Sequence, residues 1–304
     1  MKELWVEKYR PKSLDGYVFK DEQHRATVNK WLKEKTIPHV LLSGSPGTGK
    51  TTLAKAVLTE LGISDFDIME INASRERGID EVRDRVTDFI SKIPFGPFKV
   101  VLMDEADRLT AQAQDAMKGV IEEYSDHARF IFTCNSPNKI VPALHSRFQQ
   151  LHFSNIDKTE YTARVATILM EENVEFDLDL LDTFVKTAYP DLRKCINLVQ
   201  QHTIDGKLTK PAAEESGMAD YKLAMVDLFK AGKVSEARKL LCGKARPDEM
   251  EEIYRWLYDN IDLFGNEEQQ NKAILIIKQG LVDHTLVIDP EINLAATLIR
   301  LAKV

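Results

Sequence analysis

The chain has 304 residues, which at about 100–200 residues per domain predicts two or three domains. Hydrophobic residues make up 43% and charged residues 29%, with only 14 Gly and 11 Pro, so disordered, collagen-like and disulfide-rich classes are excluded. Acidic side chains outnumber basic ones by 48 to 41, a net charge of −7. This balance argues against a protein whose bulk surface attracts nucleic acid or anionic lipid.

The three cysteines, Cys134, Cys195 and Cys242, are far apart in the chain and odd in number. They therefore predict neither a disulfide framework nor a metal site, and they fit a reduced intracellular protein. The first residues lack the apolar core of a signal peptide, and no apolar run approaches the ~20 residues that span a bilayer. We expect a cytoplasmic protein, or a nuclear one in a eukaryote, with no membrane partner.

Short apolar runs alternate with helical patterns in the first half of the chain. Runs of this kind, bounded by turn or polar signals, are typical of buried parallel strands. The alternation predicts an α/β domain with a parallel sheet over residues 1–155. We expect strands at residues 39–43, 68–72, 99–103 and 129–135, and helices at residues 51–62, 80–92 and 111–124.

The strand signal ends after about residue 155, and helix-spaced apolar residues follow. The turn-rich segment 204–211 is interpreted as a linker. We therefore expect a small helical domain at residues 156–204 and a second helical domain at residues 216–304. The expected helices of the small domain cover residues 158–172, 179–188 and 192–203, and breaks in the last domain are expected at residues 232, 243–247, 265 and 289–290.

A glycine-rich turn follows the first expected strand directly and fits the pattern G-x-x-x-x-G-K-[ST] at every required position. Its glycines let backbone N–H groups surround phosphate oxygens, and the helix that follows adds a partial positive charge. Lys50 is expected to neutralise phosphate charge, and the Thr51 hydroxyl to ligate Mg²⁺. The expected nucleotide-binding positions are Gly44, Pro46, Gly47, Thr48, Gly49, Lys50, Thr51 and Thr52.

Asp104 and Glu105 directly follow the third expected strand. Acidic residues after a strand often merely begin a loop, but beside a phosphate loop they predict metal binding and catalysis. Asp104 is expected to hold Mg²⁺ or its water shell, and Glu105 to polarise an attacking water. Together with the phosphate loop, the two carboxylates predict an NTPase.

Five motifs occur in a fixed order: residues 5–11 (WVEKYRP), the phosphate loop, residues 72–80 (NASRERGID), residues 104–107 (DEAD) and residues 146–148 (SRF). This series resembles the small subunit of sliding-clamp loaders, which comprise replication factor C and its T-even-type phage counterpart within the AAA+ ATPases. The resemblance is carried by specific motifs from the start of the chain through about residue 203. Over the C-terminal ninety residues it rests on position and helical character only. It implies an ATPase domain, a helical lid and a collar domain that holds subunits in a ring.

The resemblance assigns roles around the nucleotide. It implies that Tyr9 and Arg10 lie over the adenine, that Asn135 is the sensor 1 residue, and that Arg193 is the sensor 2 residue. Taken alone, each of these is more often a turn residue or a solvated charge.

The resemblance also implies that Arg147 is an arginine finger, which completes the ATP site of a neighbouring subunit and stabilises transition-state charge. Phe148 stands where the family usually has Cys. Because the thiol is not chemically required, we expect Arg147 to keep this role.

DNA contact requires local cations in an acidic chain. Those that match the family's DNA-tracking positions are Arg77, Arg83 and Lys139, with Lys118 where the family often has Arg. Each is individually more often a solvated surface charge, and the set predicts phosphate contact rather than base reading. Gln114 matches a glutamine that couples neighbouring sites.

We therefore expect an ATPase with ATP and Mg²⁺ as cofactors, which opens a sliding clamp and loads it onto primer–template DNA. Its partners would be further copies of itself and a distinct companion subunit in a pentameric-type ring, in a phage-infected or archaeal cell or a eukaryotic nucleus. The alternatives are another AAA+ DNA motor of the Holliday-junction branch-migration type and a non-hydrolysing ring subunit. The apolar loop 93–98 faces either the clamp or its own domain.

Overall fold

The computed structural model describes residues 3–75, 79–154, 156–210, 228, 231–244 and 250–304. The chain divides into two compact units, Met1–Val165 with Pro190–Arg193, and Ala166–Tyr189 with Lys194–Val304.

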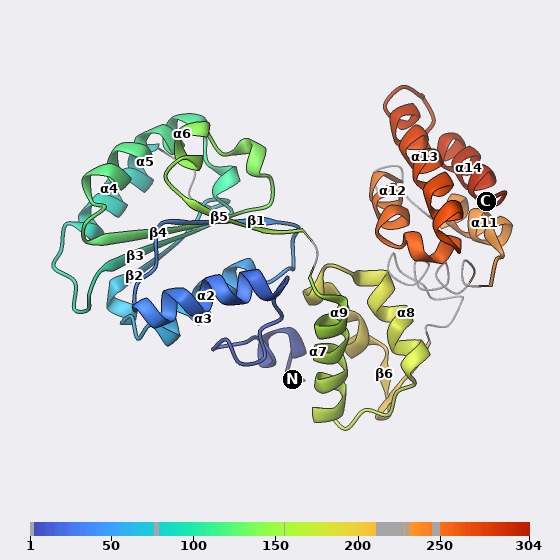
Figure 1. Cartoon of the computed structure of the whole chain (residues 1–304), viewed down its shortest axis with the longest axis horizontal. Helices are drawn as coiled ribbons and strands as arrows, with labels where there is room; N and C mark the ends of the chain where they lie inside the picture. Colours follow the sequence, from blue (N-terminus) through green and yellow to red (C-terminus); the bar gives the residue numbers. More distant parts are fainter. Residues whose placement is uncertain (1–2, 76–78, 155, 211–227, 229–230, 245–249) are drawn as a thin grey trace. The chain divides into compact units, whose positions relative to one another are not determined.

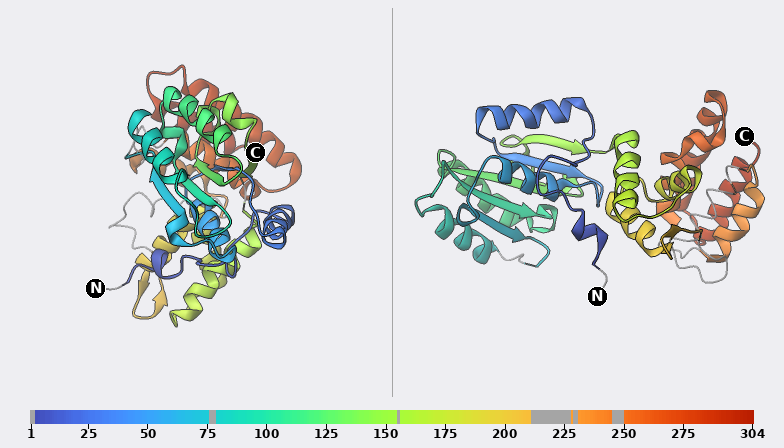
Figure 2. Two further views of the ribbon diagram at one scale, coloured as in Figure 1. Left: turned by 90° about the vertical axis from the view of Figure 1, so that its left-hand side faces the viewer. Right: turned by 90° about the horizontal axis from the view of Figure 1, so that it is seen from below.

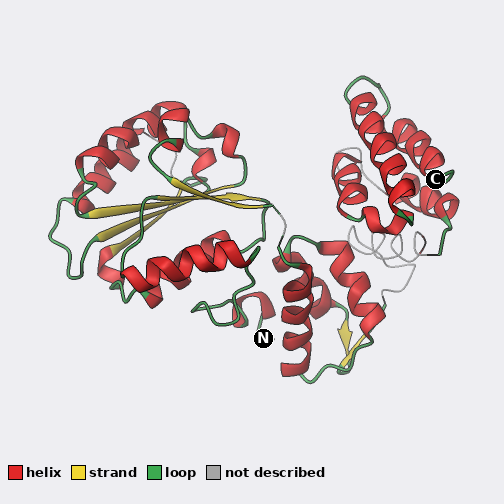
Figure 3. Ribbon diagram, in the orientation of Figure 1, coloured by secondary structure: helices red, strands yellow, loops and turns green. Residues whose placement is uncertain are grey.

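The first unit is built on a five-stranded parallel sheet with the order β2-β3-β4-β1-β5, which confirms the predicted α/β class (Figure 3). The strands are β1 (Val40–Gly44), β2 (Ile68–Asn72), β3 (Lys99–Asp104), β4 (Ala128–Cys134) and β5 (Gln149–Phe153). The first four were predicted and are confirmed, whereas β5 was not predicted. It is an edge strand that mixes exposed glutamines with buried Leu151 and Phe153, so it lacks an uninterrupted apolar run.

Helices cover both faces of this sheet, with α2 and α3 on one face and α4, α5 and α6 on the other (Figures 1 and 2). The helix α2 was not predicted, because only Val28 and Trp31 are buried along its 13 residues and its apolar stripe is thin. The helices are α1 (Trp5–Lys8), α2 (Glu22–Glu34), α3 (Lys50–Glu60), α4 (Ile79–Ile90), α5 (Ala111–Glu123) and α6 (Pro142–His145), with 3₁₀ turns η1 (Asp65–Asp67), η2 (Ala106–Arg108) and η3 (Pro137–Lys139).

Two apolar cores lie against the two faces of the sheet. On one face, Met117 and Leu144 pack with strand residues such as Phe132, and Phe148 joins this core with its ring centroid 4.8 Å from that of Phe132. On the other face, Trp31 packs with residues of α3 and β1. Phe148 is 7% exposed and is therefore part of the core that contains Phe132.

The second unit contains a small helical group and a hairpin. The elements are α7 (Lys158–Glu171), which begins in the first unit, α8 (Leu178–Ala188), α9 (Leu192–Gln201), β6 (Thr203–Ile204) and β7 (Lys207–Leu208). The prediction of a linker at residues 204–211 was wrong over its first part. Asp205 and Gly206 both have positive φ, 50° and 75°, which is the backbone of a two-residue hairpin turn, and β6 and β7 pair antiparallel across it.

Four helices end the described chain and share an apolar core that includes Tyr254, Leu257, Ile277 and Leu294. Their bounds are α11 (Val234–Lys244), α12 (Met250–Asp259), α13 (Glu267–His284) and α14 (Pro290–Leu301), with the 3₁₀ turn η5 (Ile261–Phe264). The predicted break at residue 265 is confirmed, because Gly265 follows η5 with φ 95°. The break at residues 289–290 is confirmed as well, where the Asp289 side chain caps α14.

The described residues contain no helix with the length and apolar character needed to cross a membrane. The described chain also holds no cluster of three or more His, Cys, Asp or Glu side chains suited to a metal ion.

Candidate functional site

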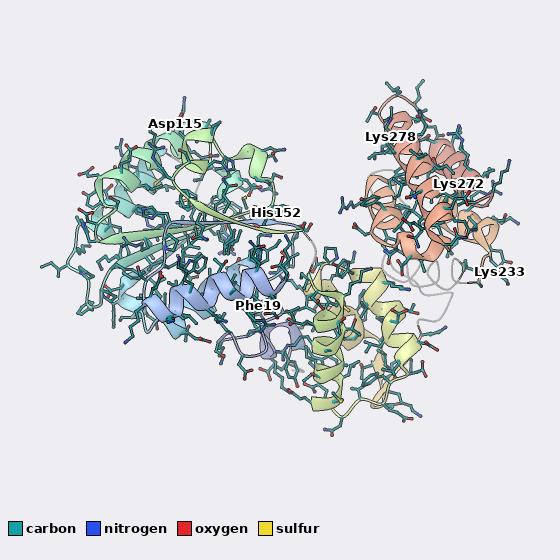
Figure 4. The ribbon with its side chains drawn as sticks, viewed as in Figure 1. Phe19, Asp115, His152, Lys233, Lys272 and Lys278 are labelled. Carbon is teal, nitrogen blue, oxygen red and sulfur yellow. The ribbon has the colours of Figure 1, made fainter. Side chains whose placement is uncertain are left out.

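The predicted phosphate loop follows β1 at the edge of the sheet where the parallel strands end. The loop begins at Gly44, where a Cβ would lie 2.2 Å from the carbonyl oxygen of Phe153, so only glycine fits. Ser43 of β1 shares a 2.9 Å hydrogen bond with His152 of β5, which is labelled in Figure 4. Neighbouring strands thus fix the entry to the loop, and loops after β1, β3 and β4 meet at this edge.

Within the loop, Thr48 is buried and its hydroxyl donates to the carbonyl of Ser45 at 2.9 Å. Gly49 has φ 87° and is the N-cap of α3. Thr52 follows in the first turn of this helix and is half-buried. The backbone therefore turns tightly and ends in a helix N-terminus, which is the arrangement that binds phosphate.

Lys50 is 7% exposed and its ammonium group lies inside the loop. Its Nζ donates to the carbonyls of Gly44 at 2.7 Å and Ser45 at 2.8 Å, and to Oδ1 of Asn135 at 3.0 Å. Burial lowers the pKa of Lys50 to about 8, and the positive charge of Arg193 also lowers it. The bond to Asn135 joins the predicted sensor 1 residue to the phosphate loop.

Asp104 and Thr51 meet at the same edge, as the sequence predicts. The Thr51 hydroxyl donates to Oδ1 of Asp104 at 2.7 Å, and the hydroxyl of Thr133 donates to the same oxygen at 2.5 Å. A hydroxyl and a carboxylate are oxygen ligands of the kind that Mg²⁺ prefers, so these two residues fit that ion. Thr133 was not predicted, because its contact arises from the pairing of β3 with β4.

Glu105 has a positive φ of 56°, which a residue with a side chain adopts only at a cost. Its backbone N–H donates to the Thr133 hydroxyl at 3.1 Å, which holds the turn after β3. The hydroxyl of Thr133 thus donates to Asp104 and accepts from Glu105. One side chain of β4 fixes both predicted acidic residues.

Asn135 is held by a second residue that sequence reasoning missed. Asp107 is 8% exposed and accepts from the backbone N–H of Asn135 at 3.4 Å and of Ser136 at 3.1 Å. Asp107 is the last residue of the DEAD motif, two positions after Glu105. A third acidic residue in this motif was the signal in the sequence that could have identified it.

Arg193 is close enough to Lys50 to lower its pKa, as noted above. The adjacent segment also abuts the phosphate loop, since a Cβ on Gly47 would lie 1.7 Å from Oδ1 of Asp191. The carbonyl of Asp191 accepts from the Tyr161 hydroxyl at 3.0 Å. The structure thus brings residue 193 to the site.

Tyr9 and Arg10 belong to the N-terminal segment after α1. The carbonyl of Tyr9 accepts from Arg164 at 2.9 Å, and Arg10 pairs with Glu7 at 3.7 Å. The ring of Tyr17 packs on the phosphate loop, 3.1 Å from where a Cβ on Gly49 would lie, and its hydroxyl donates to the carbonyl of Gly49 at 3.4 Å. Tyr17 was not predicted.

Arg147 does not lie with the phosphate loop. It precedes β5, whose first residue Gln149 pairs with Val40, whereas Phe153 at the other end of β5 pairs with Gly44. Four residues of strand at ~3.3 Å each place the two ends about 13 Å apart. Arg147 is therefore at the opposite edge of the sheet from the loop of its own chain.

The predicted DNA contacts are distributed over α4, α5 and η3. Arg83 is exposed and pairs with Asp84 at 3.0 Å, Lys139 is exposed in η3, and Lys118 is half-buried on α5. Arg77 lies outside the described residues.

Gln114 is 1% exposed on α5 and forms a hub between two segments. Its Nε2 donates to the carbonyls of Leu109 at 3.3 Å and Lys139 at 3.0 Å, and its Oε1 accepts from Val141 at 2.8 Å. Because all these bonds are buried or half-buried, α5 and the segment that carries Lys139 are held as one piece.

Comparisons with known proteins identify the family of this chain. Residues 40–155 match the ATPase family associated with various cellular activities, AAA. The replication factor C small subunit of Sulfurisphaera tokodaii is 38% identical, covering 98% of this chain and 95% of its own length. That of Methanococcus maripaludis is 33% identical, covering 99% of each.

A solved structure of the Thermotoga maritima RuvB Holliday junction branch migration motor is similar with a TM-score of 0.57. It is 18% identical and covers 74% of this chain and 79% of its own, so it shows the fold alone. The curated relatives cover nearly all of both chains at higher identity. The chain therefore belongs to the replication factor C small subunit family, within the AAA ATPases.

Proposed function

We propose that this chain hydrolyses ATP with Mg²⁺ at the carboxyl edge of its sheet. The observation that carries the proposal is the convergence of Lys50, Thr51, Asp104 and Asn135 through hydrogen bonds of 2.7–3.0 Å. Lys50 would bind the phosphates, and Thr51 and Asp104 would hold Mg²⁺. When bound, Mg²⁺ supplies positive charge that stabilises the phosphate oxygens.

In this proposal Glu105 polarises the attacking water and Asn135 orients it. The turn after β3 supports this role, because the Thr133 hydroxyl holds the backbone of Glu105 beside Asp104. Arg193 would contact the γ-phosphate from the lid side. Tyr9 and Arg10 would contact the adenine.

We further propose that Arg147 acts on the ATP of a neighbouring subunit. The support is geometric, since Arg147 and its own phosphate loop lie at opposite edges of the sheet, about 13 Å apart along β5. Because Arg147 lies far from the phosphate loop of its own chain, the γ-phosphate that it would contact belongs to an ATP bound by another subunit. A finger of this kind contributes ~10³–10⁵ in rate, so the isolated subunit would be nearly inactive.

The larger assembly is proposed as a clamp loader, a ring of copies of this chain with a companion subunit that places a sliding clamp on primer–template DNA. Support comes from the family to which the chain belongs. We propose that residues 1–155 form the ATPase domain, residues 156–204 the lid and residues 216–304 the collar. Large apolar side chains stay exposed on and beside the last two helices, where ring contacts would cover them. They are Leu275, Leu286, Ile288 and Ile292.

Backbone contacts to DNA are proposed for Arg77, Arg83, Lys118 and Lys139. The hub at Gln114 supports a coupling role, because it joins the helix of Lys118 to the segment of Lys139. A cation repeated on the inner surface of a ring binds phosphates although the chain carries a net charge of −7.

The apolar loop 93–98 is proposed as the clamp contact. Ile93 is 90% and Phe95 81% exposed, and the Phe95 ring lies 5.8 Å from that of exposed Phe66. The buried carboxylate of Asp67 accepts from the N–H groups of Phe95 at 3.0 Å and Gly96 at 2.7 Å. The loop is thus fixed by Asp67 and by buried Phe98, while Ile93 and Phe95 face outward, as a docking surface requires.

Two other functions have less support. The likeness to a branch-migration motor is at the level of fold, whereas the near full-length relatives are replication factor C small subunits. The hydroxyls of Thr51 and Thr133 both donate to the carboxylate of Asp104. A ring subunit that does not hydrolyse ATP would not require this arrangement.

The experiment that tests the proposal mixes two inactive variants in the assembled ring. Lys50→Ala abolishes nucleotide binding in its own subunit, and Arg147→Ala removes the finger that serves a neighbour. Mixed rings should recover part of the ATPase rate, since some interfaces combine an intact loop with an intact finger. Full activity of the Arg147→Ala ring would contradict action in trans.

A further inference from the structure

Arg147 is bound to a carboxylate of its own chain. Its Nε donates to Oε1 of Glu122 at 3.0 Å, and its Nη2 donates to the same oxygen. Its Nη1 donates to the carbonyl of Ala143 and to the hydroxyl of Ser146, the latter at 3.3 Å. Glu122 lies near the end of α5, 25 residues before Arg147.

These contacts use most of the hydrogen-bonding capacity of the guanidinium. An arginine has five N–H groups, and the four bonds engage four of them at one N–H per bond. A bidentate phosphate contact requires two parallel N–H groups along one edge of the planar guanidinium. Arg147 therefore has to give up at least one of its present bonds before it binds a phosphate in this way.

The bond to Glu122 is the one that an incoming phosphate replaces most readily. The Ala143 carbonyl and the Ser146 hydroxyl belong to the turn that carries Arg147 and move with it. The Glu122 side chain is 53% exposed and comes from a different helix. Exchanging a carboxylate for a phosphate also keeps a charge-assisted bond on the guanidinium, so the exchange costs little.

The surface beside Arg147 favours such an exchange. A cavity of about 630 Å³ opens next to its guanidinium, and its charged lining consists of Lys30, Arg129, Arg147 and a single carboxylate, Glu34. Lys30 pairs with Glu34 at 3.9 Å and Arg147 with Glu122, so the three cations exceed the two carboxylates by one charge. This excess makes the face weakly positive, which favours a phosphate that competes with Glu122. The ion pair with Arg147 holds the pKa of Glu122 below its ordinary value, so this carboxylate is charged at neutral pH.

Glu122 also occupies a defined place on α5. Gln114, Lys118 and Glu122 are spaced by four residues and share one stripe of the helix. Gln114 fixes the start of the segment 139–147 and Glu122 fixes its end. Asp115, which is exposed and labelled in Figure 4, lies off this stripe. The helix thus binds both ends of the segment that carries the finger.

We propose that Glu122 is a positioning residue that latches Arg147 in a retracted position until the nucleotide of a neighbouring subunit replaces it. The inference rests on the proposed role of Arg147 in trans. It adds a restraint on that role, which keeps hydrolysis low in rings whose interfaces are not closed. Closing an interface around ATP would exchange Glu122 for phosphate.

The test compares Glu122→Gln with Glu123→Gln in the assembled ring. Glu123 is the neighbouring exposed glutamate on α5, so its variant makes the same change of charge on the same turn. Loss of the latch should raise the ATPase rate without DNA by about two- to fivefold, the range expected for an exposed ion pair. The maximal DNA-stimulated rate and the KM for ATP should stay within twofold of wild type.

Glu122→Asp provides a second variant, because a carboxylate one methylene shorter should restore part of the restraint. A rate without DNA that is unchanged or lower in Glu122→Gln than in Glu123→Gln would overturn the latch. Equal melting temperatures of the two glutamine variants show that folding is not the cause. Arg147→Ala separates the two proposals: a fully active Arg147→Ala ring refutes the finger, whereas an inactive one with no effect of Glu122→Gln refutes the latch alone.

Discussion

Thr133→Val offers a sharp test of how the ATPase site is held together. Thr133 is 2% exposed, and its hydroxyl donates to Asp104 at 2.5 Å and accepts from the N–H of Glu105 at 3.1 Å. Valine keeps the shape of threonine and removes both bonds. A hydrogen bond to a charged group is worth about 1.5–3 kcal/mol, and about 1.4 kcal/mol is tenfold in rate, so kcat should fall roughly 10- to 150-fold.

The assay is steady-state ATP hydrolysis by the assembled ring with primed DNA and clamp, together with nucleotide affinity measured by fluorescence titration. Affinity should change less than kcat, because the contacts of Lys50 inside the loop do not involve Thr133. Thr133→Ser keeps the hydroxyl and should remain within a few-fold of wild type. A wild-type rate in Thr133→Val, or an equal loss in Thr133→Ser, would refute this account of the site.

Three further predictions concern stability and the clamp contact. Lys99→Met leaves the buried Asp67 without its 3.2 Å ion-pair partner and should lower the free energy of unfolding by about 3–5 kcal/mol in denaturant titrations, with Lys99→Met/Asp67→Asn recovering part of the loss. Burial lowers the pKa of His39 to about 4, so the unfolded chain binds a proton at this residue more readily than the folded one. The free energy of unfolding should therefore fall by up to about 3 kcal/mol as the pH drops from 6.5 to 4. The same pH dependence in wild type and in His39→Gln would contradict this. Phe95→Ala should weaken clamp binding at least tenfold in surface plasmon resonance with the melting temperature unchanged, and unaltered binding would exclude the loop 93–98 as the contact.

The parts of the site that were predictable are those encoded in a local pattern. The phosphate loop shows itself because glycine spacing, a preceding strand and a following helix occur together in one stretch. Asp104 and Asn135 are visible because each follows an apolar strand, and parallel strands bring their carboxyl ends to one edge. The remaining α/β architecture follows from the same alternation.

The residues that were missed depend on pairings between distant segments. Thr133 reads as an ordinary strand residue until β4 pairs beside β3, with Met103 opposite Phe132, which sets Thr133 next to Asp104. Glu122 reads as a solvated helix charge until α6 brings Arg147 to the end of α5. The strand β5 was not predicted because only alternate residues of this edge strand are apolar and buried. Such contacts are set by register and packing, which no single stretch of sequence displays.

The central claim is that ATP hydrolysis at this site drives a ring that places a clamp on primed DNA. The most direct test assembles the ring from this chain and its companion subunit and measures transfer of a labelled clamp onto circular primed DNA, with ATP and with a non-hydrolysable analogue. We expect ATPase stimulation by clamp and primed DNA together, and stable loaded clamps only with ATP and intact Asp104 and Arg147. An ATPase rate that is the same with and without clamp and DNA would contradict the clamp-loading function. Clamp loading by an Asp104→Ala ring at the wild-type rate would contradict it as well.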